Sequence, residues 1–241
     1  MRKFTRNSCE RLGLRIGKAD GNELKGSTPC QVLKTGYLDQ EWEVGLSWYL
    51  KRIKGEVIVD TGFISHQNFT KLLARLGFTV YGVDLGLFKG YFPRLNYLNC
   101  YVWNIPVLKD ESVDTIVANS LLEHLGLECY SQPVYPKAES NTIREFSRIL
   151  KSNGKLLMQV PYAKETTIIY HKTEQFYRTY THKTLVKLLH PKFNIIDKTF
   201  YARGERCWIE VNQEVADHIE QGSGFPVCLC YVEVEKMSDR F

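Results

Sequence analysis

The clearest structural signal lies in two segments, which read SVDTIVANSLLEHLGL at residues 112–127 and REFSRILKSNGKLLMQVPY at residues 144–162. Each segment contains an apolar run, at residues 115–118 and 155–160, and an amphipathic stretch and the turn at residues 152–154 lie between them. This order predicts strand, loop, helix, turn and strand, as in an open α/β sheet. In a parallel sheet ligands bind beyond the carboxyl ends of the strands, where Glu123 and His124 are expected.

The composition suits one globular domain with a substantial core. The chain has 241 residues, of which 44% are hydrophobic and 24% are charged. Residues 1–40 are polar and rich in glycine and lysine, so we interpret them as an N-terminal extension or lid before a domain at residues 41–241. The net charge of +5 allows nucleic acid as a partner, but no block of like charges favours it over an ordinary soluble protein.

Cysteine usage predicts a reduced, intracellular protein. The seven cysteines form no CxxC pair and have no zinc-finger spacing; a disulfide between Cys9 and Cys30 is the alternative. The start, MRKFTRNSCERLG, lacks the apolar segment of a signal peptide, and no apolar run approaches the ~20 residues of a membrane span. We therefore expect a cytoplasmic protein without membrane attachment, and the sequence does not indicate its oligomeric state.

Strands and helices alternate along the rest of the domain. Phe69, Leu72, Leu73 and Leu76 recur at i, i+3, i+4 and i+7, which indicates one face of a helix. We expect helices at residues 41–53, 68–76, 141–150 and 184–189, and strands at residues 56–60, 78–84, 98–102, 115–119, 155–160, 193–201 and 227–235. The predicted fold is a Rossmann-like, seven-stranded, mostly parallel sheet with helices on both faces and an antiparallel hairpin at one edge.

This layout resembles the class I S-adenosylmethionine-dependent methyltransferases, and in particular the type 11 group, over residues 41–235. The matching motifs are Glu111-Ser112-Val113-Asp114, Glu123-His124, Arg148-Ile149-Leu150-Lys151, Ser152-Asn153-Gly154 and Pro161. The resemblance implies that S-adenosylmethionine lies across the carboxyl ends of the first, second and fourth strands.

The resemblance also implies cofactor contacts at the first two strands. Asp60 and Gly62 match the acid and first glycine of the family's glycine-rich turn, whereas Ile64 and His66 replace its later glycines. Asp84 matches the acid that accepts the ribose hydroxyls, and Leu85 follows it. A turn-forming aspartate at a strand end is the alternative interpretation of Asp84.

Three further residues complete the expected cofactor site. The family often has an acid after the third strand to meet the adenine amine, but here Trp103 and Asn104 stand there. Trp103 offers a stacking surface and Asn104 an acceptor oxygen, and packing in the core or a loop is the equal alternative. Asn119 closes the fourth strand beside the expected cofactor.

Glu123 and His124 are the expected catalytic residues. Methyl transfer requires acceptor and methyl group to be held in line, and the acceptor can require a base. We expect His124 to be that base and Glu123 to orient it, to bind the methionine end through water or to join a metal site. The alternative is that His124 begins a helix and its ring is only hydrogen-bonded to the backbone. No zinc, phosphate-loop or Ser-His-Asp signature is visible, so no metal is expected.

The expected function is transfer of a methyl group to an oxygen of a small molecule or glycan. Residues 170–184 follow the fifth strand, where the family places acceptor-binding loops; a surface loop is the alternative. Pro161-Tyr162 follows the fifth rather than the fourth strand, which disfavours a nucleic-acid base methyltransferase. A non-catalytic protein that has lost the cofactor site and an RNA-binding protein on the same fold remain alternatives. Phe63, Ile64 or His66 filling the cofactor crevice would favour the non-catalytic one.

Overall fold

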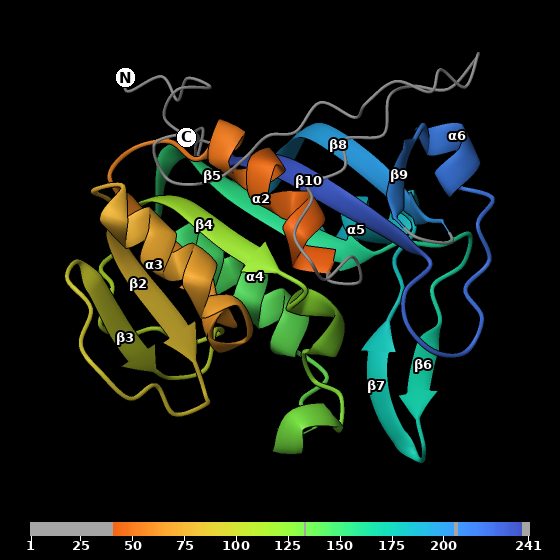
Figure 1. The fold of residues 1–241 in the computed structure, drawn as a ribbon, viewed down its shortest axis with the longest axis horizontal. Helices are drawn as coiled ribbons and strands as arrows, with labels where there is room; N and C mark the ends of the chain where they lie inside the picture. The colour runs from red at the N-terminus through yellow and green to blue at the C-terminus, as the bar shows by residue number, and fades with distance from the viewer. Residues whose placement is uncertain (1–40, 133, 205–206, 238–241) are drawn as a thin grey trace.

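A central eight-stranded sheet organises the fold (Figure 1). The computed structural model describes residues 41–132, 134–204 and 207–237; the predicted extension at residues 1–40, with Cys9 and Cys30, lies outside the described residues. The strand order is β3-β2-β1-β4-β5-β10-β8-β9. The described strands of the sheet are β1 (Val57–Thr61), β2 (Thr79–Asp84), β3 (Leu95–Asn99), β4 (Val113–Asn119), β5 (Leu150–Pro161), β8 (Phe193–Arg203), β9 (Trp208–Val211) and β10 (Cys228–Lys236).

The first five strands are parallel, and β10 lies antiparallel between β5 and β8. This arrangement confirms the predicted Rossmann-like sheet with a late antiparallel pair. The sheet has eight strands rather than seven, because the short strand β9 pairs with β8 at the edge. A separate two-stranded hairpin, β6 (Ile168–His171) and β7 (Glu174–Arg178), extends beyond the carboxyl ends of the parallel strands (Figure 1).

Helices cover both faces of the sheet, as predicted. On one face α2 (Glu41–Arg52) and α3 (Gln67–Arg75) pack Trp48, Tyr49, Phe69 and Leu73 onto the strands. On the other face α4 (Ala138–Ile149) and α5 (His182–Leu189) bury a second apolar cluster. Shorter helical segments are η1 (Phe63–His66), η2 (Leu122–His124), η3 (Cys129–Ser131) and α6 (Gln213–Ala216). No helix in the described ranges is both long and apolar enough to cross a membrane.

The motif residue Asp114 has a structural role at the amino ends of the strands. Its Oδ2 accepts the amides of Glu56 and Val57 at 3.0 and 2.9 Å, and its Oδ1 accepts Lys151 Nζ at 2.6 Å. These bonds join the start of β1 to β4 and β5. The carboxylate therefore fixes the register that brings the opposite, carboxyl ends of these strands together.

Two predicted features differ from the structure. The third strand runs over Leu95–Asn99 rather than residues 98–102, because β3 is an edge strand that buries one of its five side chains and lacks a continuous apolar run. Most of residues 168–178 belong to the expected loop at residues 170–184, but they form the β6–β7 hairpin, in which each strand buries a single side chain and so carries no buried-strand pattern. The predicted helices and the remaining strands are confirmed within a few residues at their ends.

Candidate active site

A cleft of about 440 Å³ opens at the carboxyl ends of β1, β2, β3 and β4, within the size range of small-molecule sites. Four loops, one after each of these strands, contribute its walls. Its lining consists of Gly62, Ile64, Ser65, residues 83–86, residues 100–102, Ser120, Leu121, His124, Leu125, Tyr130 and Gln132. The crevice is therefore open in this structure, although two of the family's glycines are missing.

The turn after β1 leaves the cleft free in spite of its bulky residues. Gly62 has φ 67° and ψ 26°, a left-handed conformation that favours glycine. Phe63 points into the core, where its ring meets the rings of Phe88 and Tyr97 at 5.4 and 5.8 Å. Only Ile64, at the cleft wall, replaces a family glycine on the ligand side.

Asp60 lies outside the cleft lining and is buried behind this turn. Its Oδ1 is 3.0 Å from His66 Nε2, and its Oδ2 accepts the Thr70 hydroxyl at 2.7 Å. Burial acts to lower the pKa of His66, but the charge and hydrogen bond of Asp60, with the charge of Asp84, raise it overall. His66, which stands where the family has a glycine, therefore pairs with the buried carboxyl group of Asp60.

Asp84 and Leu85, the cofactor contacts expected at the end of β2, both line the cleft. Asp84 Oδ2 accepts the amide of Ile64 at 3.1 Å, and its Oδ1 accepts the amide of Gly86 at 2.9 Å. A carboxylate has about four lone-pair sites, so two sites remain for a ligand's hydroxyls. The two amide bonds also fix the carboxylate between the turns after β1 and β2.

The predicted adenine contacts Trp103 and Asn104 do not line the cleft. Trp103 is partly buried and stacks on Tyr101 with ring centroids 4.5 Å apart, whereas Asn104 is exposed in a turn. Tyr101 and its neighbours Cys100 and Val102 line the cleft instead. The ring available to a ligand after β3 is therefore Tyr101, backed by Trp103.

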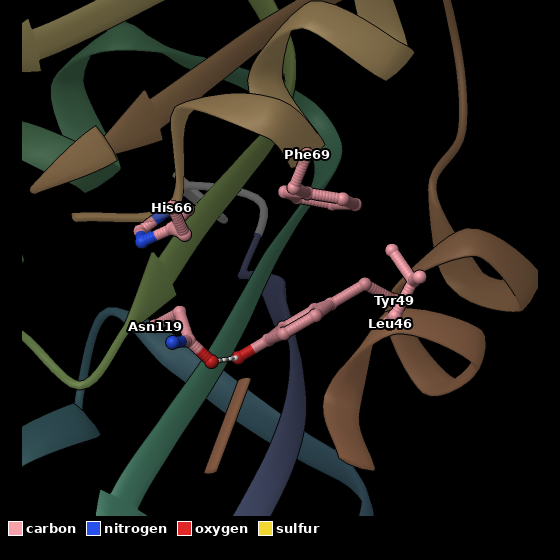
Figure 2. A pocket seen from close by; sticks show the side chains of 5 residues that line it. All are labelled: Leu46, Tyr49, His66, Phe69 and Asn119. Atoms are coloured by element: carbon pink, nitrogen blue, oxygen red, sulfur yellow. Dashed lines mark hydrogen bonds between the residues drawn. The ribbon is translucent and has the colours of Figure 1, made fainter. Parts of the chain in front are cut away.

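Asn119 ends β4 on the face covered by α2, next to a very small pocket. Figure 2 shows Tyr49 extending from α2 to Asn119, with His66 and Phe69 nearby. The Tyr49 hydroxyl donates to Asn119 Oδ1 at 2.9 Å, and Leu46 completes the lining. With about 10 Å³, this pocket has room for about one water molecule.

Glu123 is buried beside the cleft with 1% of its surface exposed. Its Oε1 accepts the Ser120 hydroxyl at 2.5 Å, and Oε2 has no hydrogen-bond partner among the described residues. Burial raises the pKa of Glu123 to about 7, against the lowering effect of the Ser120 bond. Ser120, which lines the cleft, has φ 49°, a strained value for a residue with a side chain.

His124 lines the cleft and is held from the side of the hairpin. Its Nδ1 lies 2.7 Å from the carbonyl oxygen of Phe176, so Nδ1 carries a hydrogen and Nε2 is the acceptor in the neutral ring. Nε2 is 3.9 Å from Glu123 Oε1. Burial lowers the pKa of His124 to about 4. The ring is therefore neutral near pH 7.

Hairpin strand β7 is anchored to the site through Arg178. Its guanidinium forms an ion pair with Glu139 of α4 and donates to the Leu125 carbonyl oxygen at 2.8 Å. Glu139 Oε1 also accepts the Tyr180 hydroxyl at 2.5 Å. The segment expected to bind the acceptor thus supports the loop that carries Glu123 and His124.

Sequence reasoning missed four residues at or beside the site: Tyr49, Tyr101, Ser120 and Gln159. The position of Tyr49 depends on how α2 packs, which no local pattern encodes. Gln159 could have been recognised from the sequence, because it is a carboxamide inside the apolar run LLMQVP of β5. Its side chain is fully buried, and neither polar atom has a hydrogen-bond partner in the described part of the chain.

The sheet order defines a Rossmann-like α/β fold, and the cleft lies at the carboxyl ends of its parallel strands, where such sheets bind ligands. Residues 60–158 match the model of the type 11 family described as "Methyltransferase domain". This match and the structural neighbours below confirm the predicted resemblance: the chain has the class I S-adenosylmethionine-dependent methyltransferase fold. No curated protein matches the chain.

Two solved structures illustrate the likeness. One is the 1,6-didemethyltoxoflavin-N1-methyltransferase of Burkholderia thailandensis with bound 1,6-didemethyltoxoflavin and S-adenosylhomocysteine. It has 17% identity and a TM-score of 0.56, over 81% of this chain and 76% of that one. The other is a SAM-dependent methyltransferase of Methanosarcina mazei, with 16% identity and a TM-score of 0.53, over 77% of this chain and 94% of that one. At these identities the likeness concerns the fold.

Proposed function

We propose that the protein transfers a methyl group from S-adenosylmethionine to an oxygen of a small molecule or glycan. The observation that carries this proposal is the open cleft at the carboxyl ends of the first strands, with Asp84 in one wall and His124 in another. Glu123 lies directly behind the wall that His124 and Ser120 form.

The residues of the cleft fit the donor. Asp84 keeps two acceptor sites for ribose hydroxyls, and Tyr101 offers a ring for the adenine. Gly62 holds the turn after β1 at a positive φ, which a residue with a side chain would strain. When bound, S-adenosylmethionine supplies an activated methyl group on a sulfonium cation. In the described lining no lysine or arginine opposes that positive charge.

Glu123 is the better candidate for the base, and His124 for a positioning residue. A pKa of about 7 matches a base that works near neutral pH, whereas a histidine with a pKa of about 4 is a weak one. His124 Nε2 accepts a hydrogen bond from a neighbouring hydroxyl of the acceptor and so orients the molecule. Glu123 accepts the hydrogen of the reacting hydroxyl and takes it as a proton while the new carbon–oxygen bond forms and the carbon–sulfur bond breaks, with the electron pair of that bond going to sulfur.

Nitrogen as the acceptor atom is the second candidate. The Burkholderia neighbour is an N1-methyltransferase. A base such as Glu123 serves either chemistry, because it can remove the proton of a hydroxyl or of a protonated amine. We keep oxygen as the proposal, since a neutral His124 Nε2 is an acceptor that suits a hydroxyl donor.

Calorimetry with S-adenosylhomocysteine tests the proposal without knowledge of the acceptor. We expect one site per chain with micromolar affinity. The absence of heat at millimolar ligand would support the non-catalytic alternative. Retention on RNA that falls steeply with salt, together with no binding of S-adenosylhomocysteine, would support the RNA-binding alternative.

An Asp84→Ala variant is expected to bind S-adenosylhomocysteine at least tenfold more weakly. The change removes the carboxylate that faces the ribose and the two amide bonds that fix it. Calorimetry measures the affinity, and Asp84→Asn separates charge from hydrogen bonding, because it keeps one acceptor oxygen. Unchanged affinity in the alanine variant would remove Asp84 from the cofactor site.

A further inference from the structure

Gln159 is an unexplained polar side chain at the carboxyl end of β5. It is the register partner of Asn119 on β4 and of Tyr231 on β10. Its exposed fraction is 0%, and both its Oε1 and its Nε2 lack a hydrogen-bond partner in the described ranges. Buried carboxamides are normally hydrogen-bonded, so this one requires an explanation.

The side chain faces the same side of the sheet as α2. Leu157 and Leu229 alternate with buried residues of the other face and pack with Trp48 and Tyr49, which places Gln159 on their side. Tyr49 bonds to Asn119, and its ring lies 5.8 Å from that of Tyr231. Gln159 therefore sits between two residues that both contact Tyr49.

A third unpartnered atom belongs to Glu123, which is bonded to the neighbouring Ser120. The Ser120 amide donates to the backbone oxygen of Gln159 at 3.2 Å, while its hydroxyl donates to Glu123 Oε1. Glu123 Oε2 has no partner among the described residues. Gln159 and Glu123 hold these three unsatisfied polar atoms, and both residues are bonded to Ser120 of the cleft wall, Gln159 through its backbone oxygen. This indicates a place for the polar groups of a ligand.

The charges around this place disfavour an anionic ligand. Neither the cleft nor the small pocket by Tyr49 has lysine or arginine in its described lining. Arg178 is committed to Glu139 and to the Leu125 carbonyl. The two histidines of these linings are His66, which is paired with Asp60, and His124, whose ring is neutral near pH 7, so a phosphate or carboxylate would find no free charged donor here. A carboxamide donates and accepts and so matches a hydroxyl, which does both.

We propose that Gln159 is a specificity-determining residue that binds a hydroxyl of a neutral, polyhydroxylated acceptor beside the group that is methylated. The inference rests on the proposed function and narrows its acceptor to an uncharged, sugar-like class. Because Gln159 has no exposed surface, the acceptor reaches it when the Tyr49 side chain moves away from Asn119. Glu123 and Gln159 then contact neighbouring groups of the same molecule.

Gln159→Met tests the proposal, with Gln67→Met on α3 as the matched control. Methionine has a similar shape without hydrogen-bonding groups, so removal of two unsatisfied atoms is expected to raise Tm by about 2 to 4 °C. The affinity for S-adenosylhomocysteine is expected to stay within twofold of the wild-type value in both variants. A fall in Tm in Gln159→Met would show that Gln159 is already bonded in the free protein and would overturn the proposal.

A second experiment measures activity. A small-molecule cell extract is divided by ion exchange into neutral, anionic and cationic fractions, and each fraction is incubated with the protein and labelled S-adenosylmethionine. We expect label in the neutral fraction, a loss of at least tenfold in Gln159→Met and no loss in Gln67→Met. Label confined to a charged fraction, no label in the neutral fraction, or equal labelling by both variants would overturn the proposal. Failure to bind S-adenosylhomocysteine would instead contradict the proposed function itself.

Discussion

A Glu123→Gln variant is expected to transfer methyl groups at least a hundredfold more slowly than the wild-type protein while it binds S-adenosylhomocysteine with the same affinity. Glutamine keeps the shape and the bond from Ser120 but cannot take a proton, and general bases contribute typically ~10² to 10⁴-fold. Labelled-methyl transfer and calorimetry measure the two quantities. Glu128→Gln, on an exposed side chain five residues along, is the control. A variant with a third or more of wild-type turnover would contradict the assigned role.

The same variant has a signature in the pH dependence of stability. The pKa of Glu123 is raised from 4.5 to about 7 in the folded protein, so folding favours the protonated acid. Its stabilising contribution is complete below pH 4.5 and is lost as the pH rises through 7, by about 3 kcal/mol. Glu123→Gln mimics the protonated form. Its free energy of unfolding should therefore match that of the wild type near pH 4 and exceed it by up to about 3 kcal/mol at pH 8.

The titration of His124 changes the free energy of unfolding in the opposite direction over nearly the same pH range. Its pKa is lowered from 6.5 to about 4, so its contribution is complete above pH 6.5 and is lost as the pH falls through 4. In the wild-type protein the two contributions largely offset each other between pH 4.5 and 6.5. Denaturant unfolding at several pH values should show a steeper loss on acidification in Glu123→Gln. Parallel curves for the two proteins would contradict the raised pKa of Glu123.

The sequence predicted the elements whose burial leaves a pattern. The strands at residues 56–60 and 115–119 are buried on both faces and are nearly continuous apolar runs, and the i, i+3, i+4 spacing at Phe69 and Leu73 marks α3. Edge strand β3 and hairpin strands β6 and β7 lack such a pattern, because each of them buries a single side chain. Burial, rather than strand conformation itself, is what the sequence records.

The site residues also fall into two groups: those that the strand order places and those whose partners depend on packing. Asp84, Gly62 and His124 meet at one cleft because parallel strands end at the same edge, which the strand order alone predicts. The partners of Asp60 and Asn119 depend on how η1 and α2 pack, so local sequence cannot assign them. Tyr101 rather than Trp103 lines the cleft because β3 lies three residues earlier in the chain than predicted. This shift changes which side chain leaves the strand toward the cleft.

An Arg178→Met variant is expected to lower the free energy of unfolding by about 3 to 5 kcal/mol. The Arg178–Glu139 pair is mostly buried, with 16% and 19% of the side chains exposed, and removal of one partner leaves a buried charge uncompensated. Urea unfolding measures the loss. Lys172→Met in the exposed hairpin turn is the control and should stay within ~0.5 kcal/mol of the wild type.

A double variant separates the ion pair from the rest of the hairpin contact. Arg178→Met with Glu139→Gln removes both charges and keeps the acceptor for Tyr180, so at least half of the lost stability should return. Activity should not return with it, because Leu125 loses the donor that holds the loop carrying Glu123 and His124. A double variant that recovers stability and methyl transfer together would mean that β7 supports the fold alone. Recovery of stability without transfer would show that the hairpin positions the catalytic loop, since charge neutrality would then be restored while the geometry around His124 stays altered.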